Sequence, residues 1–483
     1  MQQFELDLEL VHRILLTDPN DLNSLTAASS HQPEETFGAF QHRILLSGRD
    51  PSSILKRAYH DNLLESLERS QSLAPVKRLI LELHSEIRAL VPNRQDLHSL
   101  LNDAFDLPDV SQVETFYEIL VLAARALVQL ESPARTQSTK DWIRTVEDRG
   151  DDDNSSSAPV SPPSSTILIS IFYLLYKTEL CQQDKQSFYL TNVLAPRLLN
   201  SDEGIDFERL AFRDRFGSDP PPITKEWIQT LLTKTSSEQM EEMVNSRASR
   251  QAWIRVGWIE SILFQSDQPI ALPEIFAVDL SNLQTIRQVT RTAAAGCALA
   301  LSICTILGIN PENVLNDESA GEDLVNAMGN HRHASLESYE QSVQQASLDL
   351  ASKWKGEDLN EQEQEHIRGR TKSVLQGNDP VIKLLDGRMK EIFASVARQQ
   401  ENTPSMMRAG RATNGASVSS DGGYDTGKQF MDTAKQSFRE RGLAFYSTSL
   451  SEAVSMAVKI ADLAWTIHAD SFLEKLILEA CRN

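Results

Sequence analysis

The stretch 280–308, LSNLQTIRQVTRTAAAGCALALSICTILG, constrains the fold of this chain more than any other. Its apolar residues recur every three or four positions, which is the spacing of one helix face. From Ala293 onward the opposite face is apolar as well, and only Ser302 and Thr305 interrupt the run. A helix that is apolar on all sides is enclosed either by other helices or by lipid.

The choice between these surroundings depends on length and composition. The uncharged part, 293–309, is shorter than the roughly 20 residues that cross a bilayer, and it is rich in alanine rather than leucine. Asp279 or Ser281 can cap its start, and Gly308 can end it. We therefore predict a core helix, the central post of a protein built from helices.

The rest of the chain repeats the same periodicity in shorter segments, and no alternating pair of strands with a hairpin turn is present. The predicted fold is all-α: an elongated multi-helix bundle around the buried helix at 280–308, with two disordered polar insertions. Serine and glutamate in capping-box spacing open the two predicted C-terminal helices, at Ser449 with Glu452 and at Ser471 with Glu474. The other predicted helices cover 52–70, 74–92, 97–105, 113–130, 166–180, 188–199, 207–216, 227–243, 250–264, 336–354, 360–374 and 379–398.

Two polar stretches set the predicted domain boundaries. Segment 132–165 contains RGDDDNSSSAPVSPPSS, and segment 399–429 is rich in Ser, Gly and Asn, so both are predicted to be disordered. The predicted parts are N-terminal helices (1–131), a first linker (132–165), a central core (166–398), a second linker (399–429) and C-terminal helices (430–483). We expect the three helical parts to pack as one domain.

Charge and cysteine content limit the classes of function. The chain has 47 basic and 68 acidic residues, a formal net charge of −21, which disfavours a nucleic-acid backbone or an anionic membrane as the main partner. Four cysteines in 483 residues are too few for a disulfide framework, which fits a reducing compartment. The start of the chain carries acids where a secretory signal carries bases, so a cytoplasmic location is expected.

Motifs for chemistry are weak throughout. The chain has no phosphate-binding GxxxxGK[ST] loop and no GxSxG elbow. His331 and His333 lie in a polar loop without nearby ligands, and Trp253 and Trp258 are interpreted as core or groove packing. We predict no catalytic residue, no cofactor and no metal. Three further histidines fall among polar neighbours, where exposed side chains are expected: His60, His84 and His98.

Three serines are candidates for phosphorylation. An arginine stands three residues before Ser335 and again before Ser373, as basophilic kinases prefer, and Ser161 precedes a proline. A phosphate at any of them would add nearly two negative charges.

Several blocks, in order, resemble the T-complex protein 11 family, which includes the yeast suppressor of cAMP-dependent protein kinase loss. The blocks are LELVHRILLTDPNDLNSL, ILKRAYHDNLLESL with VKRLILELHSEIRALVP, GIDFERLAFRDRF, LPEIFAVDLSNLQTIRQVTRTAAAGCALAL, NDPVIKLLDGRMKEIF and RGLAFYSTSLSEAVSMAVKIADLAWTIHADSFLEKLI. Together they span nearly the whole chain.

The resemblance implies an all-helical, non-enzymatic regulator or scaffold that modulates cAMP and protein kinase A signalling through protein contacts. It carries over no catalytic residue. The alternative is a peripheral structural or trafficking protein at a membrane or the cytoskeleton, for which 450–478 is the candidate amphipathic helix. An enzyme would instead need a deep pocket with convergent carboxylates or histidines.

Overall fold

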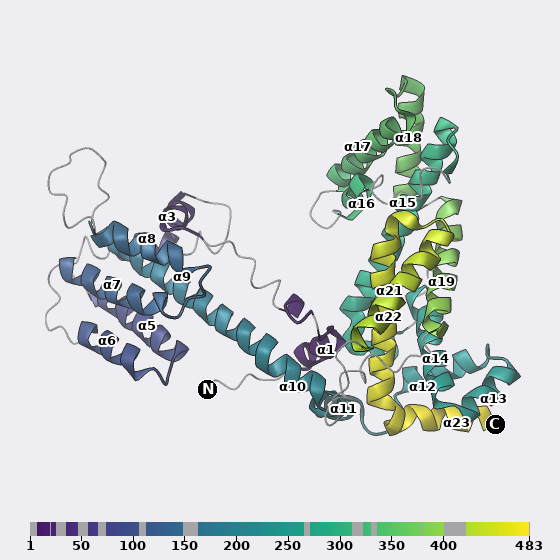
Figure 1. Cartoon of the computed structure of the whole chain (residues 1–483), viewed down its shortest axis with the longest axis horizontal. Helices are drawn as coiled ribbons and strands as arrows, with labels where there is room; N and C mark the ends of the chain where they lie inside the picture. The colour runs from purple at the N-terminus through teal and green to yellow at the C-terminus, as the bar shows by residue number, and fades with distance from the viewer. Residues whose placement is uncertain are drawn as a thin grey trace. The chain divides into compact units, whose positions relative to one another are not determined.

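The computed structural model describes residues 7–19, 21–25, 35–46, 57–65, 74–105, 113–147, 163–264, 271–311, 322–329, 336–377, 379–399 and 422–482. Within these ranges the chain forms helices joined by turns and contains no strand, which confirms the all-α fold class. The chain divides into two compact units, which differ from the expected parts (Figure 1). Unit 1 comprises 1–20 and 197–483, and unit 2 comprises 21–196.

Unit 2 is a cluster of helices that pack mainly against α7 and α9. The side chains of its core come from every one of these helices, and the largest include Phe40, Phe116, Trp142 and Tyr173. Its elements are α3 (Phe37–Leu46), α5 (Ala74–Leu90), α6 (Gln95–Phe105), α7 (Val113–Val128), α8 (Thr136–Glu147), α9 (Pro163–Tyr189) and the π-helix η2 (Leu190–Leu194). Residues 57–65 are also helical.

Unit 1 is formed by the first helix and everything from α11 onward; α10 (Ala195–Asn200) spans the boundary between the units. Its elements are α1 (Leu8–Leu16), α11 (Glu203–Phe216), α12 (Pro222–Leu232), α13 (Ser237–Asn245), α14 (Arg247–Trp258), η3 (Ile259–Leu263), η4 (Glu274–Asp279), α15 (Leu280–Leu307), α16 (Glu322–Gly329), α17 (Leu336–Lys355), α18 (Glu361–Leu375), α19 (Pro380–Gln399), α21 (Gly422–Glu440), η9 (Ala444–Tyr446), α22 (Ser447–His468), η10 (Ala469–Leu473) and α23 (Glu474–Arg482).

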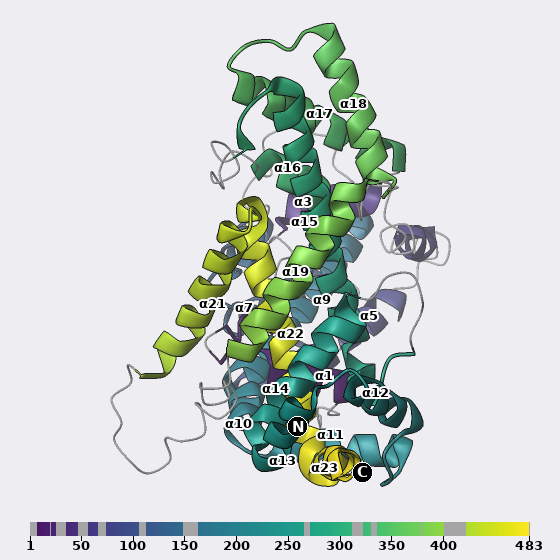
Figure 2. The ribbon, with the colours of Figure 1, turned by 90° about the vertical axis from the view of Figure 1, so that its right-hand side faces the viewer.

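Helix α15 is the centre of unit 1, as its sequence predicts. It packs against α16, α17, α18, α19 and α22, and Figure 2 shows α19 and α22 running beside it. Gly308 ends the helix in the left-handed conformation, with φ of 65°. Gly296 allows a close approach, because a Cβ added there would lie 2.0 Å from the Tyr446 hydroxyl.

The segment Glu274–Leu307 is long and apolar enough to cross a membrane by composition alone. In the structure, 61% of the most apolar 18-residue stretch of this segment is buried. Helices of unit 1 supply that cover, so we interpret α15 as a core helix.

The first predicted insertion is wrong over part of its length. Residues 136–147 form α8, which packs against α7 and buries Trp142. The prediction failed because only one face of α8 is apolar and packs against the core. The many polar residues of 132–165 therefore gave no clear sign of an amphipathic helix. Residues 148–162 lie outside the described residues.

Other local predictions also differ from the structure. Helix α16 is not among the predicted helices, and the second insertion ends early because α21 begins at Gly422. Neither C-terminal capping box forms: α22 begins at Ser447, and the chain continues from α22 through η10 into α23. Ser449 and Ser471 therefore lie inside continuous helical backbone, where their side chains cap no helix.

Candidate functional site

The predicted phosphorylation sites are only partly within the described chain. Ser335 and Ser161 lie outside it, as do His331 and His333. Ser373 is half-buried in the last turn of α18. Arg370, which makes the kinase-like spacing, pairs with Asp379 and donates to the Ser302 hydroxyl at 3.2 Å. These contacts tie α18 to α19 and α15.

The expectation that three histidines are exposed is wrong for two of them. His60 and His84 are buried, and His98 is half-buried. His60 lies beside Phe172 of α9, with ring centroids 6.3 Å apart. Burial, with Arg88 and His98 nearby, lowers the pKa of His84. The polar residues next to these histidines in the sequence lie on the exposed face of the helix, whereas the histidines lie on the buried face. Local composition therefore did not predict their burial.

A buried charge cluster in unit 1 was not predicted from the sequence. His12 of α1 lies between two carboxylates: its Nδ1 is 3.0 Å from both oxygens of Glu208, and its Nε2 is 2.8 Å from Asp279 Oδ1. All three side chains are at most 8% exposed. Asn282 donates a further bond to Asp279 at 3.2 Å. We call His12, Glu208 and Asp279 the His12 cluster.

The electrostatics of the His12 cluster favour a protonated imidazole. Burial lowers the pKa of His12, but hydrogen bonds and charge from Asp279 and Glu208 outweigh it and raise the pKa to about 10. Burial raises the pKa of Glu208, and His12 offsets only part of that rise. The cluster is therefore an imidazolium held between two carboxylates, and both ring nitrogens are used.

The sequence did contain a signal for this cluster. Glu208 and Asp279 stand in two of the blocks that carry the family resemblance, and His12 stands in a third. Their positions, 12, 208 and 279, are too far apart along the chain for any spacing rule to connect them. Only the packing of α1, α11 and η4 brings them together.

Other charged residues of the same blocks also join helices. Glu274, from the Leu-Pro-Glu step, accepts bonds from the backbone N–H groups of Ile223 (3.1 Å) and Thr224 (2.7 Å) at the start of α12. Arg209 donates to the Ile467 carbonyl at 3.1 Å, beside the π-helix η10. Each side chain satisfies backbone groups that a helix end leaves open.

A buried ion pair links α14 to α22. Arg255 pairs with Asp462, which also accepts a bond of 2.7 Å from Gln251. Burial raises the pKa of Asp462 more than Arg255 lowers it. Nearby, Trp258 is fully buried against Phe276, with ring centroids 4.0 Å apart, as its core interpretation predicts.

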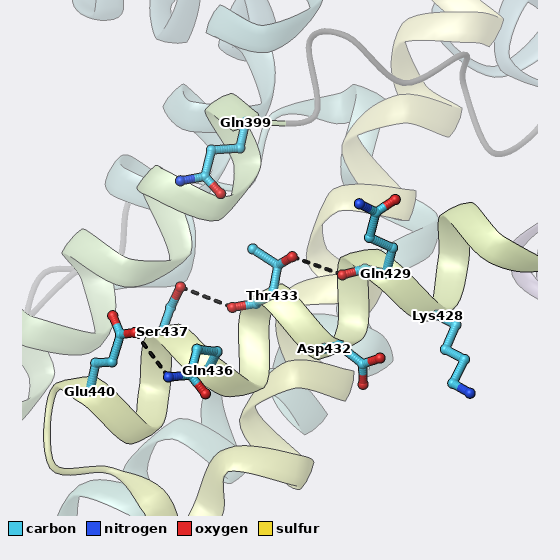
Figure 3. A pocket seen from close by; sticks show the side chains of 8 residues that line it. All are labelled: Gln399, Lys428, Gln429, Asp432, Thr433, Gln436, Ser437 and Glu440. Atoms are coloured by element: carbon cyan, nitrogen blue, oxygen red, sulfur yellow. Dashed lines mark hydrogen bonds between the residues drawn. The ribbon is translucent and has the colours of Figure 1, made fainter.

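Two accessible hollows of unit 1 adjoin along α21. One, of about 810 Å³, is shown in Figure 3, where Gln399 of α19 faces a row of polar side chains on α21. The second, of about 1030 Å³, shares Gln436 and Glu440 with the first. We call both together the α21 groove. The first is lined by Gln399, Lys428, Gln429, Asp432, Thr433, Gln436, Ser437 and Glu440, and the second by Leu301, Pro311, Leu385, Arg388, Glu391, Gln436, Arg439, Glu440, Arg441 and Gly442.

The α21 groove has a mixed polar surface. Arg441 pairs with Glu391 across it at 3.0 Å, and both are well exposed. Thr433 and Ser437 bond to the helix backbone one turn earlier. In the described part of the chain no group of three or more His, Cys, Asp or Glu is arranged to hold a metal ion.

Comparison with known proteins identifies the family. The family model for T-complex protein 11 matches residues 46–477, nearly the whole chain. No curated protein and no solved structure matches the chain. Glu208, Asp279, Glu274 and Arg209 lie inside the matched range, whereas His12 precedes it. The chain belongs to the T-complex protein 11 family.

Proposed function

We propose that this protein is a non-enzymatic helical regulator or scaffold that acts in the cytoplasm by binding a protein partner. The α21 groove is the observation that carries the proposal. It is open and lined by side chains of both charges from α19 and α21, and its lining residues also include Leu301 and the buried Leu385. A surface of this composition suits the polar face and a few apolar anchors of a partner segment.

The buried charges support the same proposal. In the His12 cluster and the Arg255–Asp462 pair, the polar atoms bond to one another between helices. These buried charged side chains fix the positions of helices. The side chains that line the α21 groove, in contrast, remain accessible to a partner.

The identity of the partner comes from the family resemblance. We propose that the protein modulates cAMP–protein kinase A signalling, with a component of that pathway as the partner. The test is direct binding of the full-length protein to the purified regulatory and catalytic subunits, with and without cAMP. We expect one subunit to bind with an affinity that changes when cAMP is added.

A double variant tests the groove. Arg388→Glu with Asp432→Lys reverses one charge in each hollow and keeps the net charge, and we expect it to weaken binding at least tenfold. The matched control is Arg368→Glu with Glu365→Lys on α18, which exchanges an exposed pair 4.0 Å apart and should leave binding unchanged. Equal binding by both variants would show that the partner binds a surface other than the α21 groove. If neither subunit binds, the cAMP part of the proposal fails.

The alternative, a peripheral role at a membrane or the cytoskeleton, needs an exposed amphipathic helix within 450–478. In the structure most apolar side chains of that segment are buried in unit 1, among them Leu450, Val454, Trp465, Phe472 and Ile477. We therefore favour the groove-binding regulator. Flotation of the full-length protein with lipid vesicles would reverse that preference.

A further inference from the structure

Helix α1 has an unusual place in the topology. It packs within unit 1, yet the chain then passes through all of unit 2 before it returns to unit 1 at Arg197. Along the backbone, α1 is therefore connected to the rest of unit 1 only through unit 2. Its attachment to unit 1 depends on side-chain contacts.

The contacts between α1 and the rest of unit 1 are mainly apolar, and they surround the charged His12 cluster. Helix α1 lies against α11 and α22 and buries Val11 and Ile14 completely. Leu15 packs at Gly204 of α11, where an added Cβ would lie 3.0 Å from its Cδ2. At the centre, His12 meets Glu208 and Asp279, which belong to two different elements of unit 1.

Docking of α1 requires a proton. A neutral imidazole carries one N–H, whereas the two carboxylates contact both ring nitrogens, so the docked ring donates twice only as imidazolium. A released and exposed His12 has an ordinary pKa near 6.5 and is mostly neutral at pH 7.5. Docking therefore takes up a proton over this range.

The other charged groups on α1 and on α11, which packs against it, are exposed or bonded to other residues. On α11, Arg209 pairs with Asp206, and Arg213 is exposed. Glu9 and Arg13 of α1 are exposed. On α22, in the part of the chain that the structure describes, Asp462 pairs with Arg255, and His468 lies against Phe212. Glu208 and Asp279 would thus remain as two buried carboxylates without a cation if a neutral His12 stayed in place, which is strongly unfavourable.

We propose that α1 is a releasable clasp that docks onto unit 1 only with a proton on His12, so that rising pH loosens it. With α1 released, residues 1–20 would remain joined to the rest of unit 1 only through the chain of unit 2. The clasp does not depend on which partner binds the α21 groove.

Hydrogen exchange of the full-length protein between pH 6.5 and 8.5 tests the clasp, after correction for the intrinsic pH dependence of amide exchange. We expect the opening constant of α1 to rise by up to tenfold per pH unit, because one proton is released on opening. The amides of α15 should show no such rise. If α1 is as protected as α15 and has the same pH response, the clasp does not exist.

Two variants and a control sharpen the test. His12→Gln should open α1 at least tenfold more often and without pH dependence, whereas His366→Gln, on the exposed face of α18, should behave as wild type. Asp279→Asn leaves one carboxylate and should flatten the pH response while α1 still docks. A wild-type pH response in Asp279→Asn would overturn the proposal even if His12→Gln fails to fold.

Discussion

At the scale of residues, two buried histidines of unit 1 have pKa values shifted in opposite directions. Two carboxylates raise the pKa of His12 to about 10, so its contribution to stability is complete below pH 6.5 and is lost as the pH rises through about 10. Burial and, to a smaller extent, the charge of Arg209 together lower the pKa of His468 to about 3. Its neutral ring lies against Phe212, with centroids 4.2 Å apart. The difference lies in the partners, not in the degree of burial.

His468 predicts a loss of stability in acid. Because the folded pKa lies below the ordinary 6.5, its contribution is complete above pH 6.5 and is lost as the pH falls towards 3. We expect the free energy of unfolding to fall by up to about 1.4 kcal/mol per pH unit from this residue. Denaturant unfolding of His468→Phe at several pH values should show that slope reduced. An unchanged slope would assign the acid sensitivity to other groups.

Gly296 predicts a steric effect. Alanine there would place its Cβ 2.0 Å from the hydroxyl and 2.6 Å from Cζ of the buried Tyr446, so the free energy of unfolding should fall by about 1–3 kcal/mol. The control Gly387→Ala, on α19, has open space around its Cβ and should gain about 0.5–1 kcal/mol. Urea titration measures both. Adding Tyr446→Leu to Gly296→Ala should cost less than the sum of the single changes, and strict additivity would contradict the clash.

At the scale of elements, periodicity predicted the helices that have a broad apolar face, such as α5 and α15. It missed α8 and α16, which are short or largely polar outside the face they bury. Helix ends were predicted less well, because distant residues cap some of them. The Glu274 carboxylate accepts from the first N–H groups of α12, which lie 50 and 51 positions away along the chain. Arg209 likewise donates to a carbonyl near the end of α22.

Glu274 gives a prediction at this scale. Glu274→Ala removes three hydrogen bonds to Ile223 and Thr224 and should lower the free energy of unfolding by about 1–3 kcal/mol. Hydrogen exchange should show the loss of protection concentrated in the first turn of α12. The control Glu226→Ala lies on the exposed face of the same helix. Equal effects of the two substitutions would show that the cap contributes little.

At the scale of the whole molecule, each unit has its own buried polar centre. In unit 2, Lys177 is fully buried and bonds to the Arg135 carbonyl at 3.0 Å and to Ser138 Oγ at 2.7 Å. It also pairs with Glu131 at 3.2 Å. These contacts join α9 to the turn before α8 and to α8 itself. In unit 1 the corresponding contacts come from the His12 cluster and the Arg255–Asp462 pair.

Because each unit has its own buried polar centre, we expect a substitution in one centre to destabilise that unit alone. Lys177→Ala leaves the Glu131 carboxylate buried without its cation and should destabilise unit 2 by about 3–5 kcal/mol. Hydrogen exchange should show lost protection in α7, α8 and α9, with α15 and α22 unchanged. Lys140→Ala, exposed on α8, is the control. Equal loss of protection in α15 would show that the two units unfold together.

The sequence by itself determined the all-α class, the central helix at 280–308 and the family, because these depend on repeated local spacing and on the order of blocks. It also indicated core or groove packing for Trp258, which is fully buried. Only the tertiary structure decided that unit 2 is inserted after α1, and that His12 meets Glu208 and Asp279. A charge is tolerated in a core only where a partner reaches it, and the chain positions of such partners follow no local rule.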